Sequence, residues 1–202
     1  MTTPQDILDF WFGDIADGWT TEDHSTLWFL GRADDDARIF ARFGNDIIRA
    51  INGDFEEWLQ TPEGTLALIL LLDQMTRATR RGTVTAFAGD ARALQICQDG
   101  ITAGSDQKLP PVYRIFFYLP LEHSENLAHQ ERCVALYATL RQSTPERESE
   151  LAQTYVYALK HRDIIAQFGR FPHRNEVLNR TDTVEERTYL ESTDERFGQQ
   201  AK

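Results

Sequence analysis

The chain has 202 residues, of which 41% are hydrophobic and 26% are charged, and its 21 basic and 32 acidic residues give a formal net charge of −11. This composition can build one ordinary hydrophobic core and excludes a largely disordered chain. Because nucleic acid phosphates and anionic lipids repel so acidic a chain, we expect neither a nucleic acid nor a membrane partner.

The two cysteines, Cys97 and Cys133, lie in helical patterns and are too few for a disulfide framework. No CxxC pair and no leader-like N-terminal pattern is present, so we expect a cytoplasmic location, where thiols stay reduced. The longest apolar run, at 66–72, is far shorter than the about 20 residues that cross a bilayer.

Helix signals recur along the chain. Thr3-Pro4 predicts the start of a first helix, which Gly13 ends, and residues 14–33 read as a loop with an aromatic patch at 27–29. Start residues, stop residues and apolar spacing predict the other helices. These lie at 35–51, from Thr61-Pro62 through the apolar run, at 90–100, at 111–118, at 124–142, at 145–168 and from 184 onward, where Thr183 and Glu186 predict a capping box.

The helix that starts at 62 has no polar face at 66–72 and is therefore expected to be central and buried. Pro120 is expected to interrupt the helix that starts at 111. Residues 83–87 are the single candidate strand, and one strand cannot form a sheet. We predict an all-α fold of stacked antiparallel helix pairs with no significant β-sheet. It forms one domain over 1–202, with an ordered core at about 3–191 and a frayed tail at 192–202.

Three segments place polar residues where apolar ones are expected. In the first, Asp73 follows the apolar run directly, and Arg77 lies four residues later on the same helical face. Two interpretations stay open: a buried salt bridge that fixes helix packing, or one wall of a polar pocket.

The second segment, at 119–125, contains Glu122, His123, Ser124 and Glu125. Ser124 could simply cap the next helix, with Glu125 in its first turn. Glu122, His123, Glu125 and His129 could also hold a metal, but neither HExxH nor ExxH is present, so we predict no metal and no cofactor. Without a GxSxG elbow, a serine hydrolase is not favoured either.

The third segment has a local charge of +3 between residues 160 and 180, within an acidic chain. Its arginines, at a rigid corner after Gly169, would suit an anion receptor. Alternatively, these cations bond the last carbonyls of the long helix and pair with Asp73, Glu122 or Glu125. The candidate residues here are His161, Asp163, Arg170, His173, Arg174 and Asn175.

From about residue 5 to residue 190, the sequence resembles the bacterial domain-of-unknown-function family 924 (DUF924). Two long strings carry most of the resemblance: Pro120-Leu121-Glu122-His123-Ser124-Glu125 and Phe168-Gly169-Arg170-Phe171-Pro172-His173-Arg174-Asn175. The resemblance implies an α–α superhelix like those of tetratricopeptide (TPR) arrays, although the TPR repeat signature itself is not visible, and it implies no established activity. The family usually reads Asp-Gln-Phe-Pro-Arg-Asn, where this chain has Asp73-Gln74-Met75-Thr76-Arg77-Ala78. That departure removes one polar residue from a pocket wall.

The leading hypothesis is a site for a small anionic ligand, formed where the three segments converge. Whether the chain is an enzyme stays open. If it is one, acid–base chemistry without a cofactor is the most economical reaction. Two alternatives are a TPR-like module that binds peptides and a purely structural cluster; the oligomeric state is not predicted. The expected catalytic residues are Glu122, His123, His161, Asp163 and His173, and the expected ligand-binding residues are Asp73, Arg77, Glu125, Arg170, Arg174 and Asn175.

Overall fold

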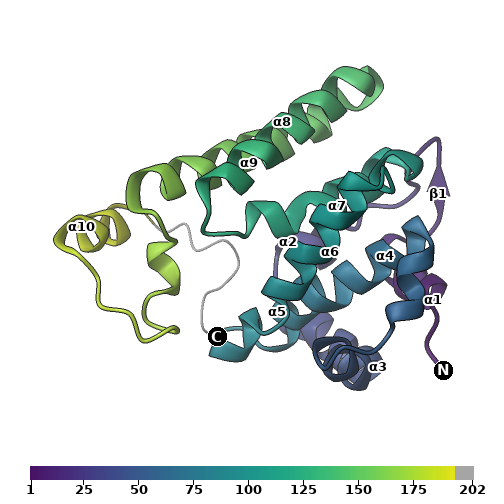
Figure 1. The fold of residues 1–202 in the computed structure, drawn as a ribbon, viewed down its shortest axis with the longest axis horizontal. Coiled ribbons are helices and arrows are strands. Elements are labelled where there is room, and N and C mark those ends of the chain that lie inside the picture. Colours follow the sequence, from purple (N-terminus) through teal and green to yellow (C-terminus); the bar gives the residue numbers. More distant parts are fainter. Residues whose placement is uncertain (194–202) are drawn as a thin grey trace. The chain divides into compact units, whose positions relative to one another are not determined.

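The computed structural model describes residues 1–193, and the structure is almost entirely helical (Figure 1). Its α-helices are α1 (Pro4–Phe12), α2 (Ser25–Phe29), α3 (Ala33–Ile51), α4 (Pro62–Ile69), α5 (Thr76–Thr79), α6 (Asp90–Thr102), α7 (Pro111–Glu122), α8 (Leu127–Ser143), α9 (Glu148–Phe168) and α10 (Val184–Ser192). Short 3-10 helices are η1 (Glu56–Gln60), η3 (Val84–Phe87), η4 (Asp106–Lys108), η5 (Pro145–Arg147) and η6 (Pro172–Arg174), and η2 (Leu70–Met75) is π-helical. The all-α prediction is confirmed.

Two local predictions are wrong. Residues 14–33 are not a plain loop: β1 (Ile15–Ala16) pairs antiparallel with β2 (Trp19–Thr20), and α2 follows. Gly18, with a positive φ of 75°, lets the chain reverse between the two strands. The candidate strand at 83–87 is largely the 3-10 helix η3, because no neighbouring strand is present to pair with it in the described chain.

The chain divides into two compact units. Unit 1 comprises Met1–Arg80 and Thr85–Pro120; unit 2 comprises Arg81–Val84 and the described residues from Leu121 onward. The single-domain organisation stays a prediction. The predicted frayed tail at 192–202 falls almost wholly outside the described residues.

The core of unit 1 is built around α4 and η2. Every residue of the run 66–72 is fully buried, so the predicted central helix is confirmed. The segment packs against α1, α3 and α6. Thr61 caps α4 by accepting a hydrogen bond from the Gly64 amide, as the Thr-Pro signal indicates.

Pro120 does not interrupt α7, contrary to the prediction. The helix continues through it to Glu122, and the boundary between the units falls directly after it. Proline lacks one helical hydrogen bond, which costs stability. Here Phe116, Phe117 and Leu121 are buried, and the Phe116 ring packs edge-on against the rings of Trp11 and Phe12, which favours the helical path.

In unit 2, α8 and α9 form a helical hairpin joined through η5, and the two helices lie side by side (Figure 1). Asn126 rather than Ser124 caps α8, by accepting a hydrogen bond from the Ala128 amide. Gly169 ends α9 in the left-handed conformation that glycine adopts without strain, as predicted. The predicted capping box of Thr183 and Glu186 begins α10.

Among residues 1–193, no helix is both long enough and apolar enough to cross a bilayer.

Candidate functional site

The first predicted segment forms a buried ion-pair group in unit 1. Asp73 lies in η2 with no solvent exposure, and its Oδ1 is 3.5 Å from Nε of Arg77. Nη2 of Arg77 also donates to Oδ2 of Asp90 at 2.7 Å, and its guanidinium lies 5.0 Å from the centre of the Phe87 ring. Two carboxylates therefore share one guanidinium, which is the salt-bridge alternative of the sequence analysis.

The π-helical segment η2 positions this group. The Thr76 hydroxyl donates to the Leu71 carbonyl five residues earlier, at 2.7 Å, where the helix is widened. Gly89 faces the same widened backbone: a Cβ atom there would lie 2.1 Å from the Leu72 carbonyl oxygen. The absence of a side chain at Gly89 lets the start of α6 approach η2, and this approach brings Asp90 to Arg77.

The second and third segments meet in unit 2. Nδ1 of His161, in α9, lies 3.2 Å from Oε1 of Glu122, at the end of α7. The same nitrogen lies 2.9 Å from the Tyr157 carbonyl oxygen. Since a carbonyl can only accept, Nδ1 carries the hydrogen in this arrangement. Glu122 and His161 are each 4% exposed, so this contact is shielded from water.

Phe171 joins the other residues of these two segments. Its fully buried ring meets the His161 ring edge-on at 5.6 Å and lies 5.5 Å from the His173 ring. The Arg174 guanidinium lies over the same ring at 4.2 Å and donates from Nη1 to the His123 carbonyl at 3.0 Å. The His123 ring is 6.4 Å from the His161 ring. We call Glu122, His123, His161, His173 and Arg174 the histidine cluster.

Gln130, which the sequence analysis did not select as a site residue, fixes the end of α7. It is fully buried in α8, and its Nε2 donates to the carbonyls of Leu121 at 3.4 Å, Glu122 at 2.5 Å and Ser124 at 2.7 Å. These bonds satisfy carbonyls that a helix end leaves without partners. The sequence signal that could have identified Gln130 is a polar amide side chain on the face of α8 that is otherwise buried.

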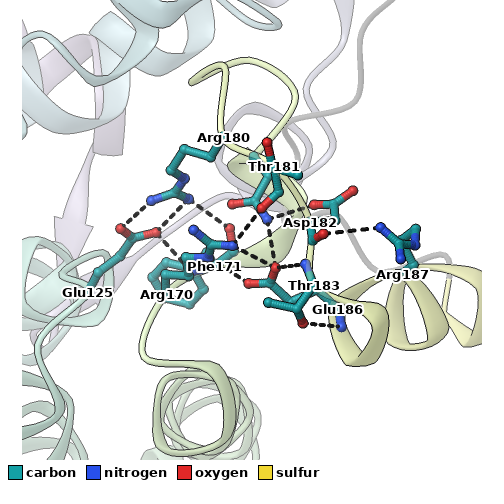
Figure 2. A network of polar contacts seen from close by, with 10 residues as sticks. Glu125, Arg170, Phe171, Arg180, Thr181, Asp182, Thr183, Glu186 and Arg187 are labelled. Atoms are coloured by element: carbon teal, nitrogen blue, oxygen red, sulfur yellow. Dashed lines mark hydrogen bonds and ion pairs between the residues drawn. The ribbon is translucent and has the colours of Figure 1, made fainter.

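Arg170 and Asn175 belong to a second network, around Glu186, and Figure 2 shows Arg170 beside Glu186. Arg170 donates to both oxygens of Glu186, from Nε at 2.6 Å and from Nη2 at 2.7 Å, and Asn175 donates to Glu186 at 3.3 Å. The hydrogen bonds from Arg170 lower the pKa of Glu186 to about 2; burial opposes this shift, and the Thr183 amide adds to it. The same bonds raise the pKa of Arg170.

Glu125 is held in the same network by Arg180 (Figure 2). Two nitrogens of Arg180 donate to the two Glu125 oxygens, at 2.7 and 3.0 Å, and the Phe171 amide donates to Oε1 at 2.8 Å. Burial alone would raise the pKa of Glu125, but the hydrogen bonds from Arg180 and Phe171 outweigh it and lower the pKa. The geometry thus favours a supporting role for Glu125, Arg170 and Asn175: they fix the corner that carries His173 and Arg174.

Asp163 lies away from the histidine cluster. Its side chain is 66% exposed and accepts a hydrogen bond from Arg162 at 2.6 Å. It follows His161 by two residues, and on a helix this spacing places two side chains on different faces.

Two further observations concern ligands. Within the described part of the chain, no group of three or more His, Cys, Asp or Glu side chains is arranged to hold a metal ion.

An open depression of about 280 Å³ lies at the α8–α9 end near η5. It is lined by Ala138, Arg141, Gln142, Glu148 and Tyr155, none of them a predicted site residue.

Comparisons with known proteins extend over nearly the whole sequence. A family model described as "Bacterial protein of unknown function (DUF924)" matches residues 7–194. A solved structure of a protein of unknown function from Agrobacterium tumefaciens, ATU0120, is similar with a TM-score of 0.80 and 37% sequence identity, over 94% of this chain and 97% of that one. No curated protein matches the sequence.

Proposed function

Because this chain belongs to the DUF924 family of bacterial proteins, whose function is unknown, we propose from its own residues that unit 2 binds a small anionic ligand at the histidine cluster. The observation that carries the proposal is the contact of Glu122 with His161, next to the His123 ring and to Arg174 and His173, which lie against Phe171.

Charge supports an anion as the ligand. Arg174 is positive at any physiological pH, and imidazoles become positive near neutral pH, whereas Glu122 supplies the cluster's single carboxylate. A phosphate or carboxylate group would meet forked donors from Arg174 and single donors from the histidines. His173 and His123 are partly exposed, which gives a ligand access to the cluster from solvent.

Each residue has a proposed role. Arg174 binds the ligand's charge, and Glu122 orients His161 through Nδ1, so that Nε2 is the ring atom for proton exchange with the ligand. His123 and His173 are further proton donors or acceptors. Acid–base chemistry is the reaction class that this set could perform. Asp73 and Arg77 are left out of the proposal, because they pair with each other and with Asp90 inside unit 1.

The test is a thermal-shift screen of phosphorylated and carboxylated metabolites. We expect at least one class to raise the melting temperature of the wild-type chain. His161→Gln and Arg174→Lys should lose that increase, because they remove an imidazole and a forked donor at nearly constant volume. The matched control is Asp163→Asn, two residues from His161 but exposed, which should keep it.

If no compound in the panel stabilises the wild type, or if both cluster variants respond like the control, the proposal fails. A purely structural cluster gives a different pattern. In that case His161→Gln and Arg174→Lys would lower the melting temperature without ligand and would leave any ligand-induced shift unchanged.

A second candidate function is a TPR-like module that binds peptides. The α8–α9 hairpin supports it, because such helix pairs are the building units of peptide-binding arrays. We also propose a cytoplasmic location, supported by a cysteine content of only two residues, both of them buried. Binding of a peptide library with no response to small anions would favour the peptide module over the anion site.

A further inference from the structure

Asn52 and Gly53 form the one Asn-Gly pair of the sequence, in the turn that follows α3. Asn52 ends the helix, and Gly53 continues the chain with a positive φ of 103°. Both residues are exposed, and a Cβ atom built on Gly53 would meet nothing within 4 Å. Within the described part of the chain, the Asn52 side chain makes no hydrogen bond. Its carboxamide is therefore free to move toward the amide nitrogen of the glycine that follows.

We infer that Asn52 is a site of spontaneous deamidation and that Arg92 controls its rate. The backbone nitrogen of Gly53 attacks Cγ of Asn52 and forms a C–N bond. The Cγ–Nδ2 bond breaks, and Nδ2 leaves as ammonia with the proton of the Gly53 amide. Glycine favours this step, because it has no Cβ atom to hinder its nitrogen.

The ring formed in this way is a five-membered imide, and water opens it. Water adds to either ring carbonyl and breaks its bond to the Gly53 nitrogen. One opening gives aspartate at position 52, and the other gives isoaspartate, in which the backbone runs through Cβ and Cγ. The overall reaction consumes one water, releases one ammonia and needs no oxidant or reductant.

The turn holds the attacking nitrogen only weakly. The Gly53 N–H donates to the Ala50 carbonyl at 3.2 Å, at the long end of the hydrogen-bond range. This bond lies at the C-terminus of α3, and helix ends open with little cost in free energy. Opening of the last turn therefore releases the nitrogen for the attack.

Arg92, in α6, restrains that opening. Its Nη1 donates to the Ala50 carbonyl. Its Nη2 donates to the carbonyls of Gly53 and Asp54, at 3.2 and 3.1 Å. One guanidinium therefore binds carbonyls on both sides of the reacting peptide bond. Removal of these donors should let the turn open more often and should speed the reaction.

The products change this end of α3. Either product adds a negative charge to a chain whose net charge is already −11, at a helix C-terminus, where the dipole disfavours it. Isoaspartate also lengthens the backbone by one methylene between Ala50 and Gly53, whose carbonyls Arg92 binds together. The isoaspartyl chain, which anion exchange separates by its added charge, should therefore melt at a lower temperature than the fresh chain.

The test is mass spectrometry of peptides cut from the folded full-length chain after incubation at mildly alkaline pH. Deamidation replaces an NH group by an oxygen atom, and the resulting mass difference is measured at each asparagine. We expect conversion at position 52 to be at least about tenfold faster than at any other asparagine, because none of the others precedes a glycine. These internal controls are Asn45, Asn126, Asn175 and Asn179.

Two variants test the role of Arg92. Arg92→Gln should speed conversion toward the rate of the urea-unfolded chain, in which no contact restrains the turn. The matched control is Arg38→Gln, which removes a 66% exposed arginine side chain from α3 and should leave the rate unchanged. Circular dichroism melting confirms that each variant is folded.

A folded chain that stays unconverted at position 52, under conditions that convert the urea-unfolded chain, overturns the inference, because the fold then blocks the attack. Equal conversion at another asparagine overturns it as well. If Arg92→Gln reacts no faster than Arg38→Gln, the role assigned to Arg92 is wrong. None of these measurements depends on the histidine cluster.

Discussion

The bond between Arg170 and Glu186 gives a sharp prediction for the variant Glu186→Gln. The carboxylate is buried, accepts two hydrogen bonds from Arg170, and also binds the Thr183 amide at 2.7 Å. A pKa that falls from the usual 4.5 to about 2 corresponds to about 3 kcal/mol of stability at neutral pH. Arg170 is 28% exposed, so solvent screens part of this energy, and we expect about 1 to 2 kcal/mol.

The pH dependence tests the cause. Because the folded-state pKa of Glu186 is lowered, its stabilisation is complete above pH 4.5 and is lost as the pH falls from 4.5 toward 2. Glu186→Gln removes the group that titrates. The difference in unfolding free energy between the wild type and the variant should therefore be largest near neutral pH and should shrink toward about pH 3.

Urea denaturation followed by far-UV circular dichroism measures this difference at a series of pH values. At neutral pH, the variant should also melt about 3 to 6 °C lower. The matched control is Glu191→Gln, which changes an exposed carboxylate of the same helix and should stay within about 0.5 kcal/mol of the wild type. A difference for Glu186→Gln that stays constant between neutral pH and about pH 3 would refute the electrostatic reasoning.

Three further variants test single contacts, each by urea denaturation at neutral pH. Gly89→Ala should destabilise the chain by about 3 kcal/mol or more, because its Cβ would lie 2.1 Å from the Leu72 carbonyl oxygen; a loss below about 1 kcal/mol would contradict that close approach. Tyr118→Phe should cost about 1 to 3 kcal/mol, because it removes a 2.6 Å hydrogen bond to the buried Asp106; an unchanged midpoint would show that this bond contributes nothing. Gln130→Leu should cost a similar amount by leaving the carbonyls at the end of α7 without their donor, and wild-type stability would argue against that cap.

Helix boundaries could be predicted from the sequence where a local signal decides them. The caps Thr3 and Thr183 and the stop at Gly169 depend on residues within one turn, and the structure confirms each. The predicted break at Pro120 was wrong, because α7 is held by packing with residues far away in sequence, such as the contacts of Phe116 with Trp11 and Phe12. The two-residue strands β1 and β2 were missed, because they are too short to show alternation.

The contacts of the candidate site also fall into those that local sequence spacing predicts and those that it does not. The pair of Asp73 and Arg77 follows from their spacing on one helix. The contact between Glu122 and His161 joins residues that are 39 positions apart, and no local rule pairs them. Glu186 was assigned only to a helix cap in the sequence analysis, although its carboxylate also holds Arg170, so one side chain serves two purposes.

The π-helical turn at η2 also limits where residues can be inserted into the chain or deleted from it. An α-helical residue advances by about 100°, so removing one residue from 70–75 would rotate the rest of that helix, through Thr79, by more than a quarter of a revolution relative to α4. Arg77 would then point away from Asp90, which α6 holds in place by packing against α4, and Asp73 and Asp90 would lose their common counter-ion. Insertions and deletions among related chains should therefore avoid this stretch, even though a π-helical turn accommodates one residue more than an α-helical turn does.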